Sequence, residues 1–402
     1  MVEKIAMSAT ADQSGQVEGT AGDPFARLDL GALVSGAARL RPERVAFHDV
    51  ADSAQSFTFG QLEQRVGATA QAWRQLSLSA GERVLIVATA SGSVLAGMLG
   101  AMRAGLDVAL VGPHLGVTEI ADFAAAIGAA AIAGEPACGD VDIGEAMFSA
   151  AARSERVRIV ASLGRTSFDG AAPLDPMAEQ IGGAAMAAPD ASSHALLITR
   201  GIDGQSHFHR QRTIVASALD FVTRVQIGTQ IPLVSAILPA SFAGLVAGPA
   251  AALIAGAPLV LHAPFDARQL LTICEALRPV HLIAPVMLAE EFAASGLADP
   301  DVLASLVMLA RYKHMPAEIP VEPPGGFLAT ELPVFDLYGI GEIAAIAERR
   351  LPSGARVAPL TAQHMLSLDG QDVLAARRKL HYLLTHGRLD TAIAIEGAAV
   401  SI

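Results

Sequence analysis

The feature that most restricts the fold of this chain is a long stretch without a charged side chain. No Asp, Glu, Lys or Arg occurs between Val225 and Phe265, and that is longer than a membrane-spanning helix requires. Pro232, Pro239 and Pro249 nevertheless divide the stretch into pieces of strand or short-helix length, because proline interrupts helices and strand ladders. We therefore expect a buried strand–helix–strand, with a membrane helix as the alternative that hydropathy alone would favour.

Apolar runs alternate with helical patterns along most of the chain. "RVLIVAT" and "DVALVGP" are typical of strands, and "SGSVLAGMLGAMRAG" between them is typical of a helix with small residues on its packing face. Such βαβ units place parallel strands under helices. Thr58 followed by Gln61 has the pattern of a capping box at the start of a helix. We predict an α/β protein with two consecutive, doubly wound, mostly parallel sheets.

Composition limits the classes of function. The 402 residues are 52% hydrophobic and carry a net charge of −12, without a basic block, which argues against a nucleic-acid surface. Residues 1–24 are typical of a disordered tail and lack the basic-then-apolar order of a signal peptide. Cys138 and Cys274 form no CxxC motif, so we expect buried thiols in a reducing compartment and a cytoplasmic protein.

The segment "LITRGIDGQSHF" contains the first candidate site. Thr199, Gly201 and Gly204 fall on an expected strand-to-helix turn, where backbone N–H groups can converge on an anion. The alternative is an ordinary glycine turn, since short glycine motifs arise often by chance. His207 and His209 follow without the carboxylates or thiols of a zinc site, and we interpret them as a polar rim.

The segment "DLYGIGE" contains the second candidate site. Glu342 falls at the carboxyl end of an expected strand, where open α/β sheets bind ligands, and a carboxylate there can hold Mg²⁺ beside phosphates. Tyr338 can stack on a base. The alternative is an exposed turn with a solvated Glu. In "HGRLDTAIAIEG", Arg388 can reach a ribose or a phosphate, although a surface ion pair with Asp390 is the simpler interpretation.

Taken in order, these pieces resemble the acyl-CoA synthetase and adenylation-domain superfamily of adenylate-forming enzymes. "FTFGQL" and the first βαβ unit are similar to its first subdomain, "YGIGE" to its YGxTE motif, and "GRLDTAIAIEG" to its hinge motif GRxDxxIKIxG. The resemblance covers about residues 42–402. It implies activation of a carboxylic acid with Mg·ATP to an acyl-adenylate, followed by transfer to a thiol such as coenzyme A.

The resemblance also implies roles for individual residues. Thr199 and Glu342 would be catalytic, and Glu342 would bind magnesium. The nucleotide would be held by Gly201, Gly204, Tyr338, Asp372 and Arg388, with Asp372 in the position of the ribose-binding Asp.

Several positions depart from the family pattern. Asp203 replaces a hydroxyl residue in the loop and would repel a triphosphate. Arg311, Tyr312 and Lys313 stand where the family has a glycine-rich adenine seat, and they would crowd a base. Gly341 replaces the Thr of YGxTE. We therefore expect the two strand tips to face one crevice in which much of the phosphate chemistry has been lost.

The expected organisation follows from the same alignment of motifs. It places a tail at residues 1–24, a first subdomain at 25–195, a second at 196–345 with the degenerate phosphate loop, and a reduced β subdomain with a hinge remnant at 346–402. The small β-barrel would be reduced, and the C-terminal domain with its catalytic Lys would be absent. Two hypotheses remain. One is an acid–AMP ligase-like protein whose weak activity depends on a protein partner supplying that domain, and the other is a pseudoenzyme that binds an acyl ligand or a partner.

Overall fold

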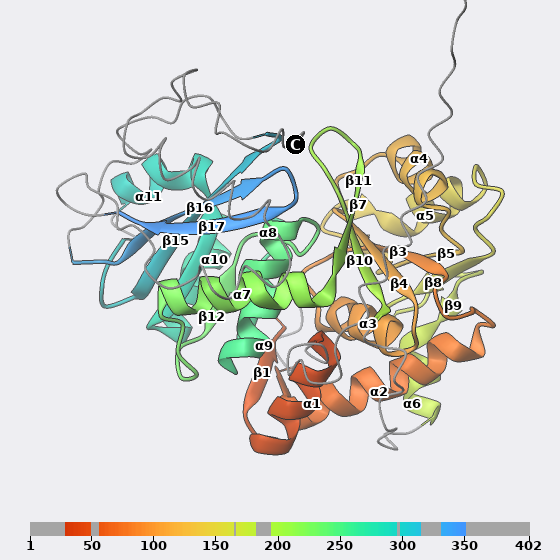
Figure 1. The fold of residues 1–402 in the computed structure, drawn as a ribbon, viewed down its shortest axis with the longest axis horizontal. Coiled ribbons are helices and arrows are strands. Elements are labelled where there is room, and N and C mark those ends of the chain that lie inside the picture. Colours follow the sequence, from red (N-terminus) through yellow and green to blue (C-terminus); the bar gives the residue numbers. More distant parts are fainter. Residues whose placement is uncertain are drawn as a thin grey trace, which may run out of the picture.

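A computed structural model describes residues 29–49, 56–164, 166–181, 194–295, 298–314 and 331–350. In this part of the chain two large, mostly parallel sheets are packed by helices (Figure 1), with a two-stranded ribbon beside them. The ribbon consists of β6 (Ala137–Cys138) and β7 (Val141–Asp142). The predicted α/β architecture is confirmed.

The first sheet has the strand order β11-β10-β4-β3-β5-β8-β9, and only the β10–β11 pair is antiparallel. Its strands are β3 (Arg83–Val87), β4 (Asp107–Val111), β5 (Ala131–Gly134), β8 (Ile159–Ser162), β9 (Ala172–Pro173), β10 (Leu196–Arg200) and β11 (Ser206–Arg210).

Helices cover both faces of this sheet because successive strand residues point to opposite sides. Val84 and Ile86 of β3 enter the core formed with α2 (Phe59–Gln75) and α3 (Gly92–Arg103). Leu85 and Val87 enter the core formed with α4 (Val117–Ile127) and α5 (Ile143–Ala151). A further helix, α6 (Leu174–Ile181), packs on α2.

The second sheet has the order β17-β16-β15-β14-β12-β13-β1-β2, with antiparallel pairs only at its two edges. Its strands are β1 (Val45–His48), β2 (Ser56–Thr58), β12 (Leu233–Ser235), β13 (Leu259–Leu261), β14 (Val280–Pro285), β15 (Leu303–Tyr312), β16 (Val334–Ile340) and β17 (Ala344–Arg349). The order of the strands along the chain does not follow the two sheets. β1 and β2 precede all the strands of the first sheet in sequence but belong to the second sheet, whereas β10 and β11 complete the first sheet. The domain boundaries expected from the sequence stay a prediction.

The uncharged stretch forms the predicted strand–helix–strand. After β12 comes a continuous helical segment made of α8 (Phe242–Leu245), a π-helical turn η2 (Val246–Ala250) and α9 (Ala251–Ala255), followed by β13. Pro249 lies in the π-helical turn, which accommodates the missing N–H of proline. Among the described helices, none is both long and apolar enough to cross a membrane.

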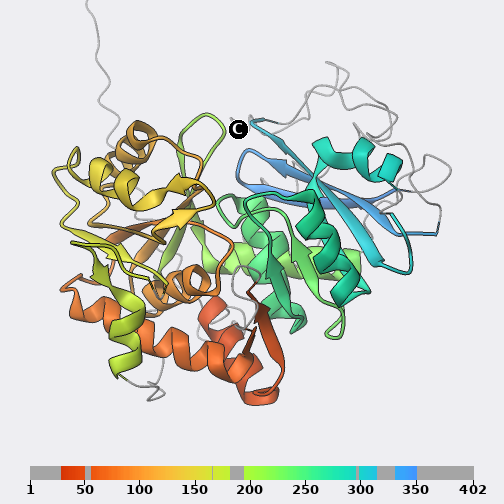
Figure 2. The ribbon, with the colours of Figure 1, turned by 180° about the vertical axis from the view of Figure 1, so that it is seen from behind.

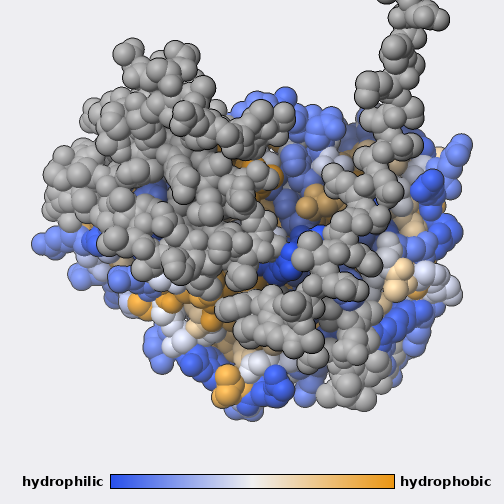
Figure 3. Space-filling model, viewed as in Figure 1, coloured by the Kyte–Doolittle hydropathy of each residue, from blue (hydrophilic) through white to orange (hydrophobic). Residues whose placement is uncertain are grey.

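One hydrophobic core joins the two halves. It contains residues from the inner faces of both sheets together with α1 (Leu30–Leu40), α2, α3, α7 (Gln211–Val225) and α9. In both views α1 lies at the bottom of the molecule, between the halves (Figures 1 and 2). The outer face of the second sheet packs on α10 (Ala267–Leu277), the short turn η3 (Val286–Leu288) and α11 (Ala289–Ser295). Outside the grey atoms, the hydrophobic side chains in Figure 3 form several patches among hydrophilic ones.

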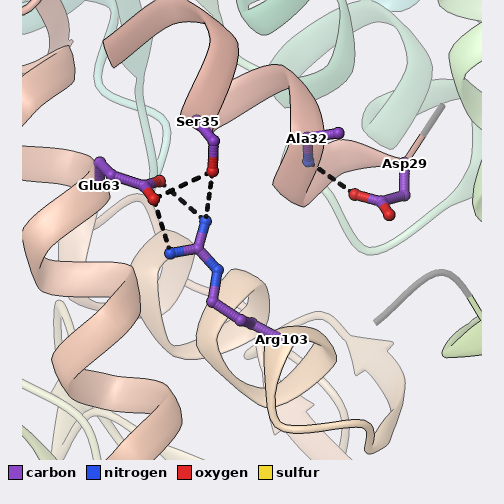
Figure 4. Close-up of polar contacts among 5 residues, drawn as sticks. All are labelled: Asp29, Ala32, Ser35, Glu63 and Arg103. Atoms are coloured by element: carbon purple, nitrogen blue, oxygen red, sulfur yellow. Dashed lines mark hydrogen bonds and ion pairs between the residues drawn. The ribbon is translucent and has the colours of Figure 1, made fainter. Parts of the chain in front are cut away.

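In this core a buried arginine links three helices through hydrogen bonds (Figure 4). Arg103 of α3 is 2% exposed, and its guanidinium donates two hydrogen bonds to Glu63 of α2, at 3.0 and 2.8 Å. The same guanidinium donates to the Ser35 hydroxyl of α1 at 3.2 Å. Asp29 begins α1 by accepting a hydrogen bond from the Ala32 amide at 2.6 Å, as an N-cap residue does.

Candidate functional site

The glycine segment joins two antiparallel strands. β10 and β11 pair from Leu196–Arg210 to Arg200–Ser206, and α7 begins only after β11. The expected strand-to-helix turn is therefore wrong: the "SHFHR" segment, although largely polar, is extended and takes a place at the sheet edge. In Figure 1 this hairpin stands between the first sheet and the β15–β17 part of the second.

The hairpin turn uses most of its own N–H groups. The Gly201 N–H donates to the Gln205 carbonyl at 2.8 Å, and the Gly204 N–H donates to the Gly201 carbonyl at 2.9 Å. The Gln205 N–H donates to the Asp203 carboxylate at 3.1 Å. Gly204 has a φ of 82°, a conformation that glycine adopts without strain. Because these donors are already paired, the turn offers a phosphate fewer N–H groups than the sequence suggested.

Thr199 lies beneath the turn and is fully buried. Its hydroxyl Oγ1 is 2.8 Å from Nε2 of His209 on β11, and the His209 ring lies 4.9 Å from the ring of Phe242. Burial lowers the pKa of His209 to about 4, with a smaller contribution from the charge of His207. His209 is therefore a neutral core residue at neutral pH. The interpretation of the two imidazoles as a polar rim is wrong for this one.

Glu342 lies on the turn between β16 and β17, at the carboxyl end of β16, as expected from the sequence. Its backbone φ is 54°, and only 7% of the residue is exposed. Oε2 accepts a hydrogen bond from the Phe242 N–H at 2.7 Å, which belongs to the first residue of α8. Oε1 accepts from Nη2 of Arg311 at 2.5 Å. Each oxygen of the expected magnesium ligand therefore already accepts one hydrogen bond from the protein.

The described residues do not fit a magnesium site. A guanidinium 2.5 Å from the carboxylate neutralises the charge that would attract a dication and repels the ion itself. No group of three or more His, Cys, Asp or Glu in the described ranges is arranged to hold a metal ion.

Tyr338 lies inside β16 and is 4% exposed. Its ring stacks on that of Tyr312 at a centroid distance of 6.4 Å and an interplanar angle of 20°. One face of the expected adenine-stacking ring is thus turned toward another protein side chain. Asp372 and Arg388, the other expected nucleotide contacts, lie outside the described residues.

A cavity of about 440 Å³ lies between the two halves. Arg200, Gly201 and Ile202 of the hairpin line it from one side, and Arg311, the partner of Glu342, lines it from the other. Lys313 Nζ lies 3.7 Å from the Asp203 carboxylate, so the strand tips also meet directly. As expected from the sequence, the glycine turn lines the crevice. The acidic tip reaches it only through Arg311, because Glu342 is not among the described residues that line the crevice. Thr199 is not among the described residues that line it.

The cavity combines cations with an apolar wall. Arg200 is held by Glu119 at 3.0 Å, and Arg311 is held by Glu342. The apolar part of the wall includes Leu115, Ile202, Ile237, Leu238 and Phe265. Ile202 and Phe265 are 55% and 48% exposed and lie at the rim. Such a cavity suits a molecule that has an anionic end and an apolar body.

Comparison with known proteins identifies the family. The AMP-binding enzyme family matches residues 34–364. The chain belongs to this family of AMP-binding enzymes. No curated protein matches the chain.

Several solved structures share the fold of this chain. A benzoate CoA ligase from Burkholderia xenovorans LB400 is 17% identical with a TM-score of 0.67, and the match covers 80% of this chain and 63% of that one. The N-terminal domain of FACL13 from Mycobacterium tuberculosis is 14% identical with a TM-score of 0.66, covering 85% and 81%. The NpsA N-terminal subdomain from Klebsiella oxytoca is 19% identical with a TM-score of 0.62, covering 81% and 77%. The matched region spans less than two-thirds of the benzoate CoA ligase.

Sequence reasoning missed two side-chain pairs at the candidate site. Arg311 was expected to crowd the adenine seat, but its pairing with Glu342 was not foreseen. The Thr199–His209 pair was missed as well. A signal was available in the second case, because Thr199 lies opposite His207 in the hairpin, so His209, two residues further along β11, is its diagonal neighbour on the same face.

Proposed function

We propose that this chain is an acid–AMP ligase-like protein that binds a carboxylic acid or its acyl derivative in the central cavity, and that its own Mg·ATP-dependent adenylation is silent. The observation that carries the proposal is the contact of 2.5 Å between Arg311 and Glu342. Among the described residues, Glu342 is the carboxylate for which the family resemblance implies magnesium binding. The contact with Arg311 opposes the binding of Mg²⁺ to this carboxylate.

The charges of the cavity support an anionic ligand. A guanidinium has five N–H donors in a planar fork that matches a carboxylate. The Arg311 side chain is 34% exposed and gives one donor to Glu342, so other donors remain for a ligand. The Ile202–Phe265 rim and the apolar wall would cover the body of the acid.

A second candidate is an active ligase of the cytoplasm. Membership of the AMP-binding enzyme family supports it. In this case ATP, Mg²⁺ and coenzyme A would be used, and a protein partner would supply the lysine of the C-terminal domain. Arg311 would have to leave Glu342 when the nucleotide binds. Acid-dependent ATP–pyrophosphate exchange that disappears in Glu342→Ala would establish this candidate instead.

The test is a calorimetric titration of the chain with Mg·ATP and with a panel of aliphatic and aromatic acids. We expect an acid to bind and Mg·ATP to give no binding. Arg311→Ala should weaken acid binding by roughly tenfold or more, the loss of about one charge-assisted contact. It should also open Glu342, so that Mg·ATP binding appears.

Arg268→Ala is the matched control, because it removes the same charge from an exposed position on α10. It should change neither titration. Tight binding of Mg·ATP by the unmodified chain would overturn the proposal, as would acid binding that Arg311→Ala leaves unchanged.

A further inference from the structure

A second, smaller cavity of about 190 Å³ lies beside the first. The two share His262 and Ala263 in their walls. The first half of the chain contributes Glu135, which follows β5, together with Thr89 and Ser91, which lie between β3 and α3. The second half contributes residues after β13 and the start of α10, so this cavity also lies where the halves meet.

Glu135 is the charged group of this cavity. The Thr89 hydroxyl donates a hydrogen bond to its carboxylate, and the Ser91 hydroxyl is a second partner. Ser91 also accepts from the Val94 N–H as the N-cap of α3, which leaves its single proton for Glu135. An ionised carboxylate has about four acceptor positions. Two of them therefore remain after these hydroxyls are counted.

The surroundings of Glu135 lack a compensating cation. Among the described residues that line the cavity there is neither Lys nor Arg, and no described ion pair includes Glu135. Burial raises the pKa of Glu135, and the charges of Asp49 and Asp175 raise it further, while the two hydroxyls lower it. A positive group in the cavity would offset all the unfavourable contributions at once.

The neighbouring thiol of Cys138 supplies the cavity with neither a positive charge nor a reactive nucleophile. Cys138 lies in the wall, but burial and the Glu135 carboxylate raise its pKa, so it is a neutral thiol at neutral pH and a poor nucleophile. His262 also faces the cavity, and burial lowers its pKa, so it too supplies no positive charge at neutral pH. The small cavity is thus acidic, whereas the larger one is lined by Arg200 and Arg311, each of which is paired with a Glu.

We propose that the small cavity is a binding site for a protonated primary amine whose ammonium group donates hydrogen bonds to the free acceptor positions of Glu135. An ammonium has three donors and no acceptor, which matches a carboxylate that is only partly satisfied. The volume of about 190 Å³ is that of a cavity for a small organic molecule, since an apolar cavity of about 150 Å³ holds benzene, so the ligand is a small amine. The site is independent of the acyl-binding function proposed above.

The test compares propylamine with 1-propanol, its neutral counterpart of similar size, by ligand-detected NMR on the full chain at pH 7.5. We expect saturable binding of propylamine and at least about tenfold weaker binding of propanol, because only the amine forms the charged contact. Glu135→Gln keeps the shape of the side chain and removes its charge, and it should weaken propylamine binding by a similar factor. Glu145→Gln, an exposed change at the start of α5, is the control and should leave binding unchanged.

Two results would overturn the proposal: equal binding of amine and alcohol, or unchanged amine binding in Glu135→Gln. Should the Gln variant fail to fold, the unmodified chain still decides the matter through pH. Because the pKa of Glu135 is raised, lowering the pH from 7.5 to 5 protonates part of it, and the amine affinity should fall. An amine affinity that is constant over this range would also count against the site.

Discussion

At the scale of single residues, the Thr199–His209 pair gives a stability prediction. Thr199→Val keeps the size of the side chain but removes the hydroxyl that satisfies His209 Nε2 at 2.8 Å. Because His209 is 5% exposed, the unpaired nitrogen should reduce the free energy of unfolding by about 1–3 kcal/mol. Urea unfolding measures this free energy. The control is Thr223→Val, at an exposed hydroxyl on α7, which should change the free energy of unfolding by less than about 0.5 kcal/mol.

The lowered pKa values of two buried histidines predict how the stability of the chain depends on pH. His209 and His281 have pKa values of about 4 in the folded chain because of burial, against 6.5 when unfolded. Between these values the unfolded chain binds more protons than the folded one, so stability is complete above pH 6.5 and falls as the pH falls toward 4. Each histidine contributes on the order of 1.4 kcal/mol per pKa unit of difference.

His281→Asn isolates one of these two contributions, since the amide can still face the Ser305 hydroxyl, which lies 2.8 Å from His281 Nδ1. The variant should lose less stability than the unmodified chain between pH 6.5 and 4, as measured by urea unfolding at each pH. Parallel curves for the two proteins would show that folding does not lower the pKa of His281.

The site could be predicted from sequence only as far as local patterns reach. The turns at Gly201 and Glu342 follow from glycines placed at strand ends, although the first was expected to lead into a helix and joins two strands instead. The contact between Arg311 and Glu342 joins β15 to the turn after β16, and its geometry depends on strand register. No local pattern carries that information, so a side chain expected to obstruct a base was found to neutralise a carboxylate.

At the scale of elements, the Arg103–Glu63–Ser35 cluster predicts how strongly three helices depend on one another. Arg103→Ala removes the two hydrogen bonds that Arg103 donates to Glu63, leaves that carboxylate with only the one from the Ser35 hydroxyl, and opens a void among α1, α2 and α3. We expect a loss of about 3 kcal/mol in the free energy of unfolding, the lower part of the range for breaking buried pairs, because the Glu63 side chain is 22% exposed.

The matched control for this cluster is the pair of Arg158 with Glu82. It has similar geometry, at 2.9 Å, but the two side chains are 53% and 28% exposed. Arg158→Ala should therefore reduce the free energy of unfolding much less than Arg103→Ala does. If both variants lost the same free energy of unfolding, burial of Arg103 would add nothing to the stability that this ion pair contributes.

Elements with strong periodicity were predicted correctly, and those with weak patterns were not. The capping box of Thr58 and Gln61 begins α2 as expected, and β3, α3 and β4 follow the apolar pattern. β11 was missed because its exposed Phe208 and its His residues do not alternate as a half-buried strand should. β1 lies in the second sheet, beside β13. This placement depends on pairing between strands far apart in the chain, and it cannot be inferred from a local stretch of sequence.

At the scale of the whole molecule, the shared core predicts that both halves unfold together. Residues of both sheets belong to one hydrophobic cluster, so neither half can open without exposing the inner face of the other. Two probes report on the halves separately. Trp73 of α2 is the single tryptophan and is fully buried, whereas Cys274 of α10 is a buried thiol in the outer core of the second sheet.

We expect Trp73 fluorescence and the reaction of Cys274 with a thiol reagent to show the same urea midpoint, measured in a Cys138→Ser background that removes the other thiol. Burial raises the pKa of Cys274 to about 12, so its reaction requires exposure by unfolding. Separated midpoints would instead mean that the halves are independent folding units joined by the chain. The cavities between them would then open before the sheets unfold, and an acid or amine bound there would stabilise both transitions only if it touched both halves.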